Sequence, residues 1–252
     1  MKVLVIVLNK GRGSGEYVRQ MCKRLTIKGF KFTIASTQEV LVEGCDNLVV
    51  PLKSSIIPVH EYLPGAKQKP VYSMEYDEAN EIVQAFLDAL RPGMKEFDLI
   101  HTHHANVTAI VGQKLGEEFN IPVINTVHGT GLERLEKYHP RIQDEIKICL
   151  EKTDKIVQTS QFIRNMLRDK LPSIPDEKVH IIPCGVDTEV IKPKVRSLLE
   201  KAFTREEIKK FNLEKPFALF AGAHIEAKGP DHLVNAMIHY HQEIQTIFIG
   251  DG

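Results

Sequence analysis

Four histidines in this 252-residue sequence stand where side chains could bind a ligand or move a proton. His101, His103 and His104 lie in the segment "HTHHAN", and His128 follows the apolar segment "VINTV". An imidazole can donate or accept a hydrogen bond, transfer a proton near neutral pH or ligate a metal ion. Because side chains alternate along a strand, residues 101 and 103 are expected on one face, and a neighbouring strand could bring His128 close to them.

No carboxylate follows these histidines at the spacing of a metal-dependent hydrolase. The pattern His-x-His-x-Asp-His needs an Asp and a His where this sequence has Ala105 and Asn106. We therefore expect no metal ion here, and we interpret the histidines as hydrogen-bonding groups that line a cleft or are satisfied in the core. The four cysteines form no Cys-x-x-Cys pair, which argues against a zinc site or a disulfide framework and is typical of a reducing compartment.

Three glycines form a second candidate site. Gly11, Gly13 and Gly15 lie in "NKGRGSGE", directly after the apolar run "VLVIVL". A dinucleotide-binding fingerprint would need a third glycine where Glu16 stands, and a P-loop would need Lys and a hydroxyl residue after the last glycine. Two interpretations remain open: a loop whose backbone N–H groups bind an anion at a helix N-terminus, or a tight turn without a ligand.

Four further polar residues could contribute to a site. Ser160 follows "IVQT" and is expected first of all as the N-cap of a helix. Glu133 and Glu136, in "GLERLEKY", could accept a proton from a hydroxyl, although a solvated surface is the favoured interpretation. Lys228 precedes a predicted helix and is either an exposed side chain or a cation for a ligand.

Short apolar segments alternate with amphipathic segments and would position these residues. The strands are expected at residues 3–8, 31–36, 48–52, 98–102, 123–127, 155–159 and 179–182. The helices are expected at residues 15–28, 77–90, 105–119, 140–152 and 161–171. Several strands are almost continuous runs of Val and Ile, as expected for a parallel sheet that is covered on both faces. The series predicts an α/β fold with a doubly wound, Rossmann-like parallel sheet.

Three regions are expected along the chain. Residues 1–190 form an N-terminal domain, in which the segment 53–75, with three prolines and a Pro-Gly pair, is predicted to be a long loop. Residues 191–212 form a charged linker, and residues 213–252 contain one strand–helix–strand unit of a second Rossmann-like domain. A unit of this size is too small for a core of its own, so we interpret the second domain as incomplete.

The composition is that of an ordinary globular protein. Lys and Arg together number 33, as do Asp and Glu, so the charge gives no reason to expect nucleic acid as a partner. The apolar run at the N-terminus is too short for a signal peptide, and no later segment has the length needed to span a bilayer. We therefore expect a cytoplasmic protein.

Several segments in order point to a known family. They are "NKGRGSGEYVRQMCKRLTIKGFKFTIAS", "FDLIHTHHANVTAIVGQKLGEEFNIPVINTVHGTG", "VHIIPCGVDTEVIKP" and "FALFAGAHIEAKGPDHLVNAM". Together they resemble the retaining glycosyltransferases of the GT-B fold, of the family 4 type, which includes glycogen, sucrose-phosphate and phosphatidylinositol-mannosyl transferases. Each segment alone is a weak match, but the combination is specific and covers nearly the whole chain except 53–75.

This resemblance implies two Rossmann-like domains that face each other across a cleft, with the acceptor on the N-terminal side. It implies sugar transfer from a UDP- or GDP-sugar co-substrate, with no other cofactor, to a hydroxyl of a carbohydrate, lipid or small-molecule acceptor. The implied catalytic residues are His128 and Lys228. The implied residues for the donor diphosphate are Gly11, Gly13, Gly15, Lys228 and Gly229. The candidates on the acceptor side of the cleft are His101, His103, His104, Ser160 and Glu133.

The sequence departs from the family pattern at two points. The family's Arg partner of Lys228 is Ala223 here, and its Glu-x7-Glu motif, which holds the donor sugar and ribose, would lie beyond residue 252. We therefore expect a fragment that lacks most of the donor domain and could be inactive alone. The alternative is a non-catalytic half that binds an acceptor or a partner and needs another polypeptide. An incomplete C-terminal sheet could also pair with a second copy of the chain.

Overall fold

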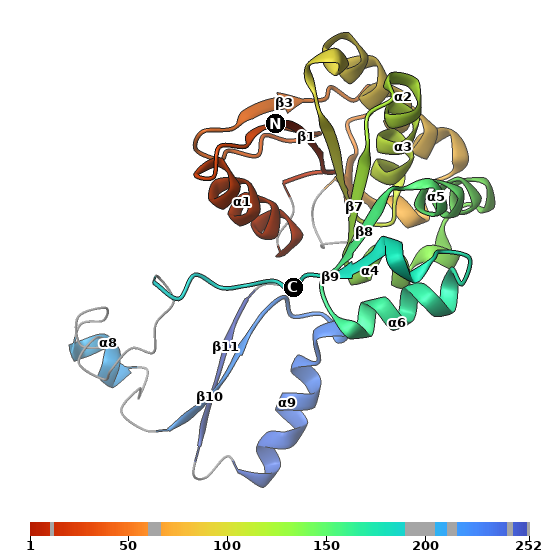
Figure 1. Ribbon diagram of the computed structural model, residues 1–252. Coiled ribbons are helices and arrows are strands. Elements are labelled where there is room, and N and C mark those ends of the chain that lie inside the picture. Colours follow the sequence, from red (N-terminus) through yellow and green to blue (C-terminus); the bar gives the residue numbers. More distant parts are fainter. Residues whose placement is uncertain (11–12, 60–66, 190–204, 211–215, 241–243, 251–252) are drawn as a thin grey trace. The chain divides into compact units, whose positions relative to one another are not determined.

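The computed structural model describes residues 1–10, 13–59, 67–189, 205–210, 216–240 and 244–250 (Figure 1). The chain divides into two compact units, Met1–Cys184 and Gly185–Gly252. Gly11, one of the expected site residues, lies outside the described residues. Among the described residues, no helix is long and apolar enough to cross a membrane.

The first unit is built on a seven-stranded sheet in which every neighbouring pair of strands is parallel. In spatial order the strands are β3 (Asp46–Val49), β2 (Lys31–Ser36), β1 (Lys2–Ile6), β6 (Leu99–His103), β7 (Val123–Val127), β8 (Lys155–Gln158) and β9 (Val179–Ile181). The chain runs outward from β1 in one direction and then returns through β6 to the other edge, as in a doubly wound sheet. The predicted α/β fold with a Rossmann-like parallel sheet is therefore confirmed.

Helices cover both faces of this sheet (Figure 1). They are α1 (Gly13–Thr26), α2 (Tyr76–Leu90), α3 (Val107–Phe119), α4 (Gly129–Glu133), α5 (Pro140–Lys152) and α6 (Gln161–Lys170). Short 3-10 turns lie at η1 (Val71–Ser73), η2 (Arg91–Glu96), η3 (Leu135–Lys137) and η4 (Asp176–Lys178). The longer helices begin and end within two residues of the predicted bounds.

Two apolar clusters hold the helices to the sheet. Alternate residues of β1 point to opposite faces, so Val3 and Val5 pack with Val18 and Cys22 of α1. Leu4 and its neighbours on the other face pack with α2, α3 and α5. Because both faces are covered, β1 is buried almost along its whole length, which explains its continuous apolar sequence.

The prediction of a long loop at 53–75 is wrong in part. This segment contains two short parallel strands, β4 (Ile57–Val59) and β5 (Gln68–Pro70), and the turn η1; residues 60–66 between the strands lie outside the described residues. Val71 and Met74 are buried in the larger apolar cluster. Proline is tolerated here because the strands are short and form no part of the main sheet.

The second unit contains the strand–helix–strand arrangement that the sequence predicts. Two parallel strands, β10 (Phe217–Ala221) and β11 (Gln245–Ile249), pair with each other, and α9 (Pro230–Ala236) lies between them in the chain. The remaining helical segments are α8 (Arg205–Lys210), η5 (Glu226–Lys228) and η6 (Met237–His239). No side chain of β10, α9 or β11 is fully buried in the described part of this unit.

Candidate functional site

The carboxyl ends of β6 and β7 bring the four histidines together. These strands are adjacent and parallel, with His103 opposite Thr126 in the register. Residues 101 and 103 therefore share one face of the sheet with Thr126, and His128 follows directly after β7. Ligands of open α/β sheets bind at this edge, beyond the carboxyl ends of the strands.

The imidazole rings form a contiguous stack. The rings of His101 and His103 lie 4.5 Å apart between centroids at 26°, and those of His103 and His128 lie 5.5 Å apart at 20°. His103 Nδ1 is 3.2 Å from His128 Nε2, and His101 Nε2 is 2.8 Å from Thr126 Oγ1. His104 also contacts His128, with 4.6 Å between the ring centroids. The expected proximity of the histidines is thus observed.

Tyr17 of α1 closes this stack from the side of the helix. Its ring meets His103 edge-on at 5.9 Å between centroids and His128 at 5.3 Å. Burial raises the pKa of Tyr17, the charge of Cys184 raises it further, and a hydrogen bond with Thr126 acts in the opposite direction. Tyr17 is therefore a neutral phenol at physiological pH.

The three interacting histidines are neutral as well. Burial lowers the pKa of His101 to about 4, with a smaller contribution from the charge of His128. Burial also lowers the pKa of His128 to about 4, and it lowers that of the fully buried His103 well below the usual range. A neutral imidazole offers one donor and one acceptor, so this cluster can hydrogen-bond a ligand without adding charge.

The turn between β6 and α3 is held in an unusual conformation beside the stack. His104 has a φ of 73°, in the left-handed region that side chains other than glycine seldom adopt. Asn125 Nδ2 donates to the His104 carbonyl at 3.2 Å and to Thr102 Oγ1 at 2.7 Å, which stabilises the turn. Helix α4 lies against it so closely that a Cβ at Gly131 would be 2.9 Å from the Ala105 carbonyl oxygen. The surrounding packing thus fixes the strained backbone.

The glycines after β1 have different environments. Gly13 begins α1 and is exposed, with nothing within 4 Å of the position of a Cβ. Gly15 is buried, and a Cβ there would be 1.8 Å from the Lys10 carbonyl oxygen. Arg19 Nη1 donates to the same carbonyl at 3.2 Å. Gly15 therefore has a structural reason to be glycine, whatever ligand the turn binds.

The remaining candidates of the first unit lie on α4, η3 and α6. Ser160 is the N-cap of α6, with its Oγ accepting from the Ile163 N–H at 3.3 Å, as predicted. Glu133 is exposed at the end of α4. Glu136 forms an ion pair with Lys170, and this hydrogen bond lowers the pKa of its carboxyl, which makes it a weak base.

Two candidates belong to the second unit. Lys228 is the last residue of η5 and its side chain is exposed. Gly229 has a φ of 68° and is the N-cap residue of α9, without a side chain to cap the helix. The backbone of this turn therefore favours glycine.

The sequence did not indicate Tyr17 and Thr126 as residues of this site. Thr126 lies two residues before His128, so strand alternation could have placed it on the same face. Tyr17 lies one position before Val18 on α1, and its orientation depends on how that helix crosses the sheet, which no sequence pattern specifies. The described residues contain no group of three His, Cys, Asp or Glu side chains arranged to hold a metal ion.

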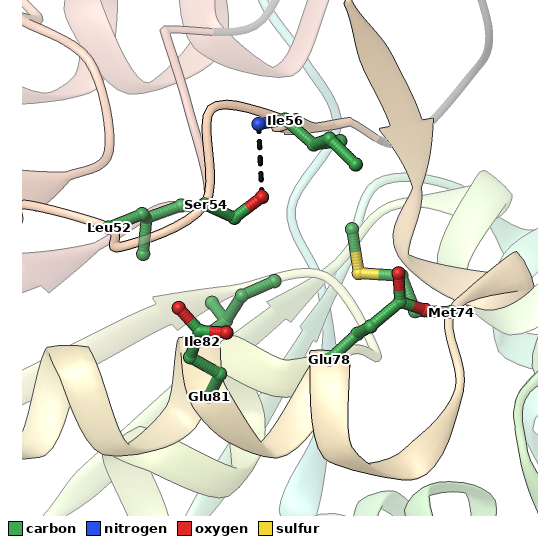
Figure 2. A pocket seen from close by; sticks show the side chains of 7 residues that line it. All are labelled: Leu52, Ser54, Ile56, Met74, Glu78, Glu81 and Ile82. Atoms are coloured by element: carbon green, nitrogen blue, oxygen red, sulfur yellow. Dashed lines mark hydrogen bonds between the residues drawn. The ribbon is translucent and has the colours of Figure 1, made fainter.

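A small cavity of about 60 Å³ lies between the segment after β3 and the start of α2 (Figure 2). Its lining includes Leu52, Ser54 and Ile56 on one side, and Glu78 and Glu81 on the other. The same three residues of the segment also line a pocket of about 190 Å³, together with Thr37, Val49, Val50, Pro51, Ser55, Ile57 and Pro58. None of the four histidines lines either hollow.

Several curated proteins are similar to this chain in sequence. A D-inositol 3-phosphate glycosyltransferase of Xylanimonas cellulosilytica is 24% identical over 162 residues, which are 61% of this chain and 38% of that protein. An uncharacterised glycosyltransferase of Methanocaldococcus jannaschii is 30% identical over 157 residues, 62% of this chain and 37% of that protein. The chain thus spans less than half the length of these curated relatives.

A solved structure shares the fold. The crystal structure of the Anabaena protein HepE in complex with UDP-glucose matches with a TM-score of 0.67 at 12% identity, covering 100% of this chain and 61% of that one. The family model of Glycosyltransferase Family 4 matches residues 11–190, which include β6, β7 and all four histidines. The resemblance to GT-B glycosyltransferases of the family 4 type is confirmed, and the chain belongs to Glycosyltransferase Family 4.

Proposed function

We propose that this chain serves a retaining glycosyltransferase, which moves a sugar from a nucleotide-sugar donor to an acceptor hydroxyl. The observation that carries the proposal is the neutral histidine stack at the carboxyl ends of β6 and β7, in a chain of this family. The Anabaena structure of the same fold holds UDP-glucose, which favours a nucleotide sugar as the ligand.

His128 is proposed to hydrogen-bond the donor sugar. His128 is half-buried beside α1 and neutral. It can therefore hydrogen-bond a sugar hydroxyl without attracting the negatively charged diphosphate to itself. The leaving nucleoside diphosphate gains negative charge in the transition state, which backbone N–H groups and cations stabilise. We assign that role to the turn of Gly11, Gly13 and Gly15 and, in the second unit, to Lys228 with Gly229.

The acceptor is proposed to bind at the same edge of the sheet, between the histidines and the segment after β3. His101, His103, His104, Ser160 and Glu133 remain the polar candidates for this side. The pocket of about 190 Å³ at the ends of β2 and β3 offers apolar and hydroxyl groups, which suits a ligand with both kinds of surface.

The test is titration of the chain with UDP-glucose, GDP-mannose and ADP-glucose by calorimetry, followed by measurement of nucleoside diphosphate release. One donor should bind, and the anomeric configuration of the released or transferred sugar, read by NMR, should be that of the donor. His128→Ala should weaken binding about tenfold, as expected for one lost hydrogen bond. His180→Ala, on the exposed edge strand β9, is the matched control and should bind normally. If none of the three donors binds and no diphosphate is released, the proposal is wrong.

A further inference from the structure

His103 has an environment that restricts where its ring can carry hydrogen. Its side chain is 0% exposed, and its Nδ1 lies 3.2 Å from His128 Nε2. Its other nitrogen, Nε2, is buried and has no hydrogen-bond partner among the described residues. The rings of His101 and Tyr17 pack against it. Among the described residues, the His103 ring therefore makes one hydrogen bond to another imidazole and no other hydrogen bond.

Two arrangements of hydrogen could produce this contact between neutral rings. In the first, His103 Nδ1–H donates to His128 Nε2, and His128 carries its hydrogen on Nδ1. In the second, His128 Nε2–H donates to His103 Nδ1, and His103 must carry its hydrogen on the buried Nε2. The second arrangement leaves a buried N–H without an acceptor, and orphaned N–H groups are rarer in proteins than under-satisfied acceptors. The first arrangement is therefore favoured.

The start of α4 is compatible with the same arrangement. His128 is the N-cap residue of α4, yet its side chain accepts no hydrogen bond from the helix. His139 occupies the same position before α5, and its Nδ1 accepts from the Arg141 N–H at 3.3 Å. An Nδ1 that carries hydrogen cannot accept such a bond. The contrast between the two N-caps agrees with a protonated Nδ1 in neutral His128.

We propose that His103 is a positioning residue that holds His128 as its Nδ1–H tautomer, so that this N–H donates to an oxygen of the ligand. His128 is only half-buried, so part of this residue is accessible to a ligand. The tautomer is inferred from the geometry of the free protein. The identity of the ligand group, a sugar hydroxyl of the donor, rests on the proposed function.

The tautomer can be read directly from the ring nitrogens. Long-range ¹H–¹⁵N correlation spectra of the ¹⁵N-histidine-labelled 252-residue chain, recorded at pH 7.5 without ligand, distinguish protonated from bare nitrogens. His128 should show a protonated Nδ1 and a bare Nε2, and His103 should show the same pattern. A protonated Nε2 on His128 in the wild-type protein would overturn the proposal.

Two substitutions of His103 separate positioning from simple packing. His103→Asn keeps an N–H donor near the place of Nδ1 and should leave His128 in its Nδ1–H form. His103→Leu fills the site without a donor and should shift His128 towards the Nε2–H form. An unchanged Nδ1–H signal in the Leu variant would contradict the proposal. The signals of His180 report whether each variant is folded, and if the Leu variant does not fold, the wild-type and Asn spectra decide.

Ligand affinity then tests the consequence, with UDP-glucose as the probe, or GDP-mannose or ADP-glucose where the wild type binds that donor instead. His103→Leu should weaken binding about tenfold and His103→Asn less than twofold. If the wild type binds but both variants bind equally well, His103 does not act through His128 on the ligand. If the wild type binds no nucleotide sugar, the proposed function fails. The NMR measurement without ligand then still decides whether His128 has the proposed tautomer.

Discussion

At the scale of single residues, the site combines groups that would titrate near neutral pH in water but do not do so here. The three stacked imidazoles lie between the end of the sheet and Tyr17 of α1, and burial is the main cause of each lowered pKa. Neutral imidazoles can orient a ligand through hydrogen bonds, but they do not attract it by charge. It also makes the folded state sensitive to acid.

Stability should fall as the pH is lowered from 7 to 5. Histidines in the unfolded chain take up protons near pH 6.5, whereas His101 and His128 in the folded protein do so only near 4. Between these values the unfolded state binds more protons, so each histidine lowers the free energy of unfolding by about 1 kcal/mol per pH unit. The contribution is complete above about pH 6.5 and is lost progressively down to about pH 4. Urea unfolding at half-unit steps of pH measures the slope.

A substitution identifies the source of this slope. His101→Gln cannot titrate but can still bond Thr126, so it should make the slope between pH 5 and 6.5 shallower. His180→Gln, exposed on β9, removes a histidine outside the stack and is the matched control. A slope that is equal in all three proteins would show that the stack does not control acid stability.

The thiols should differ sharply in reactivity. Cys22 and Cys149 are buried, and burial raises the pKa of Cys22 beyond the usual range and that of Cys149 to about 12. Cys184 is exposed. A thiol reagent needs access and thiolate, so Cys184 should be labelled first in the native protein and Cys22 and Cys149 only after unfolding. Peptide mass spectrometry after brief alkylation measures this, and early labelling of Cys22 would contradict the burial described for α1.

At the scale of elements, much of the architecture was predictable. A strand covered on both faces is mostly apolar, and β2 and β7 were predicted with their observed bounds. The distance and angle at which a helix packs on the sheet were not predictable, because they depend on the volumes of the side chains at the contact. Thus the position of Tyr17 against the histidines could not be derived, and β4 and β5 were missed because short proline-containing strands carry turn signals.

The close contact between the start of α1 and the turn after β1 can be tested by substitution. A Cβ at Gly15 would overlap the Lys10 carbonyl, so Gly15→Ala must displace the turn or the helix and should lower the free energy of unfolding by about 1–3 kcal/mol. Gly13→Ala, two residues earlier in the same helix, meets no atom and should be neutral or stabilising by up to about 1 kcal/mol. Urea unfolding of both variants gives the comparison. Equal effects would mean that the turn after β1 does not have the close contact described.

At the scale of the whole molecule, the two units differ in how much they bury. Every residue of the two apolar clusters belongs to the unit Met1–Cys184. In the described part of the other unit, the strands and α9 have no fully buried side chain. The resemblance in the sequence predicted the family, which the family model confirms, and the strand–helix–strand segment of the second unit is observed as β10, α9 and β11. The roles assigned to Lys228 and Gly229 stay predictions, because they depend on a ligand.

This difference predicts which part of the chain folds independently. Residues 1–184, expressed alone, should unfold in one cooperative transition and keep the His101, His103 and His128 signals of the whole chain, because their contacts lie within this unit. Residues 185–252 alone should show no cooperative transition, since burial of apolar surface is what offsets the loss of chain entropy. Urea titrations followed by circular dichroism and histidine NMR test both halves. A cooperative transition in the short fragment would mean that it has a core of its own, and altered histidine signals in the long one would mean that the site depends on the rest of the chain.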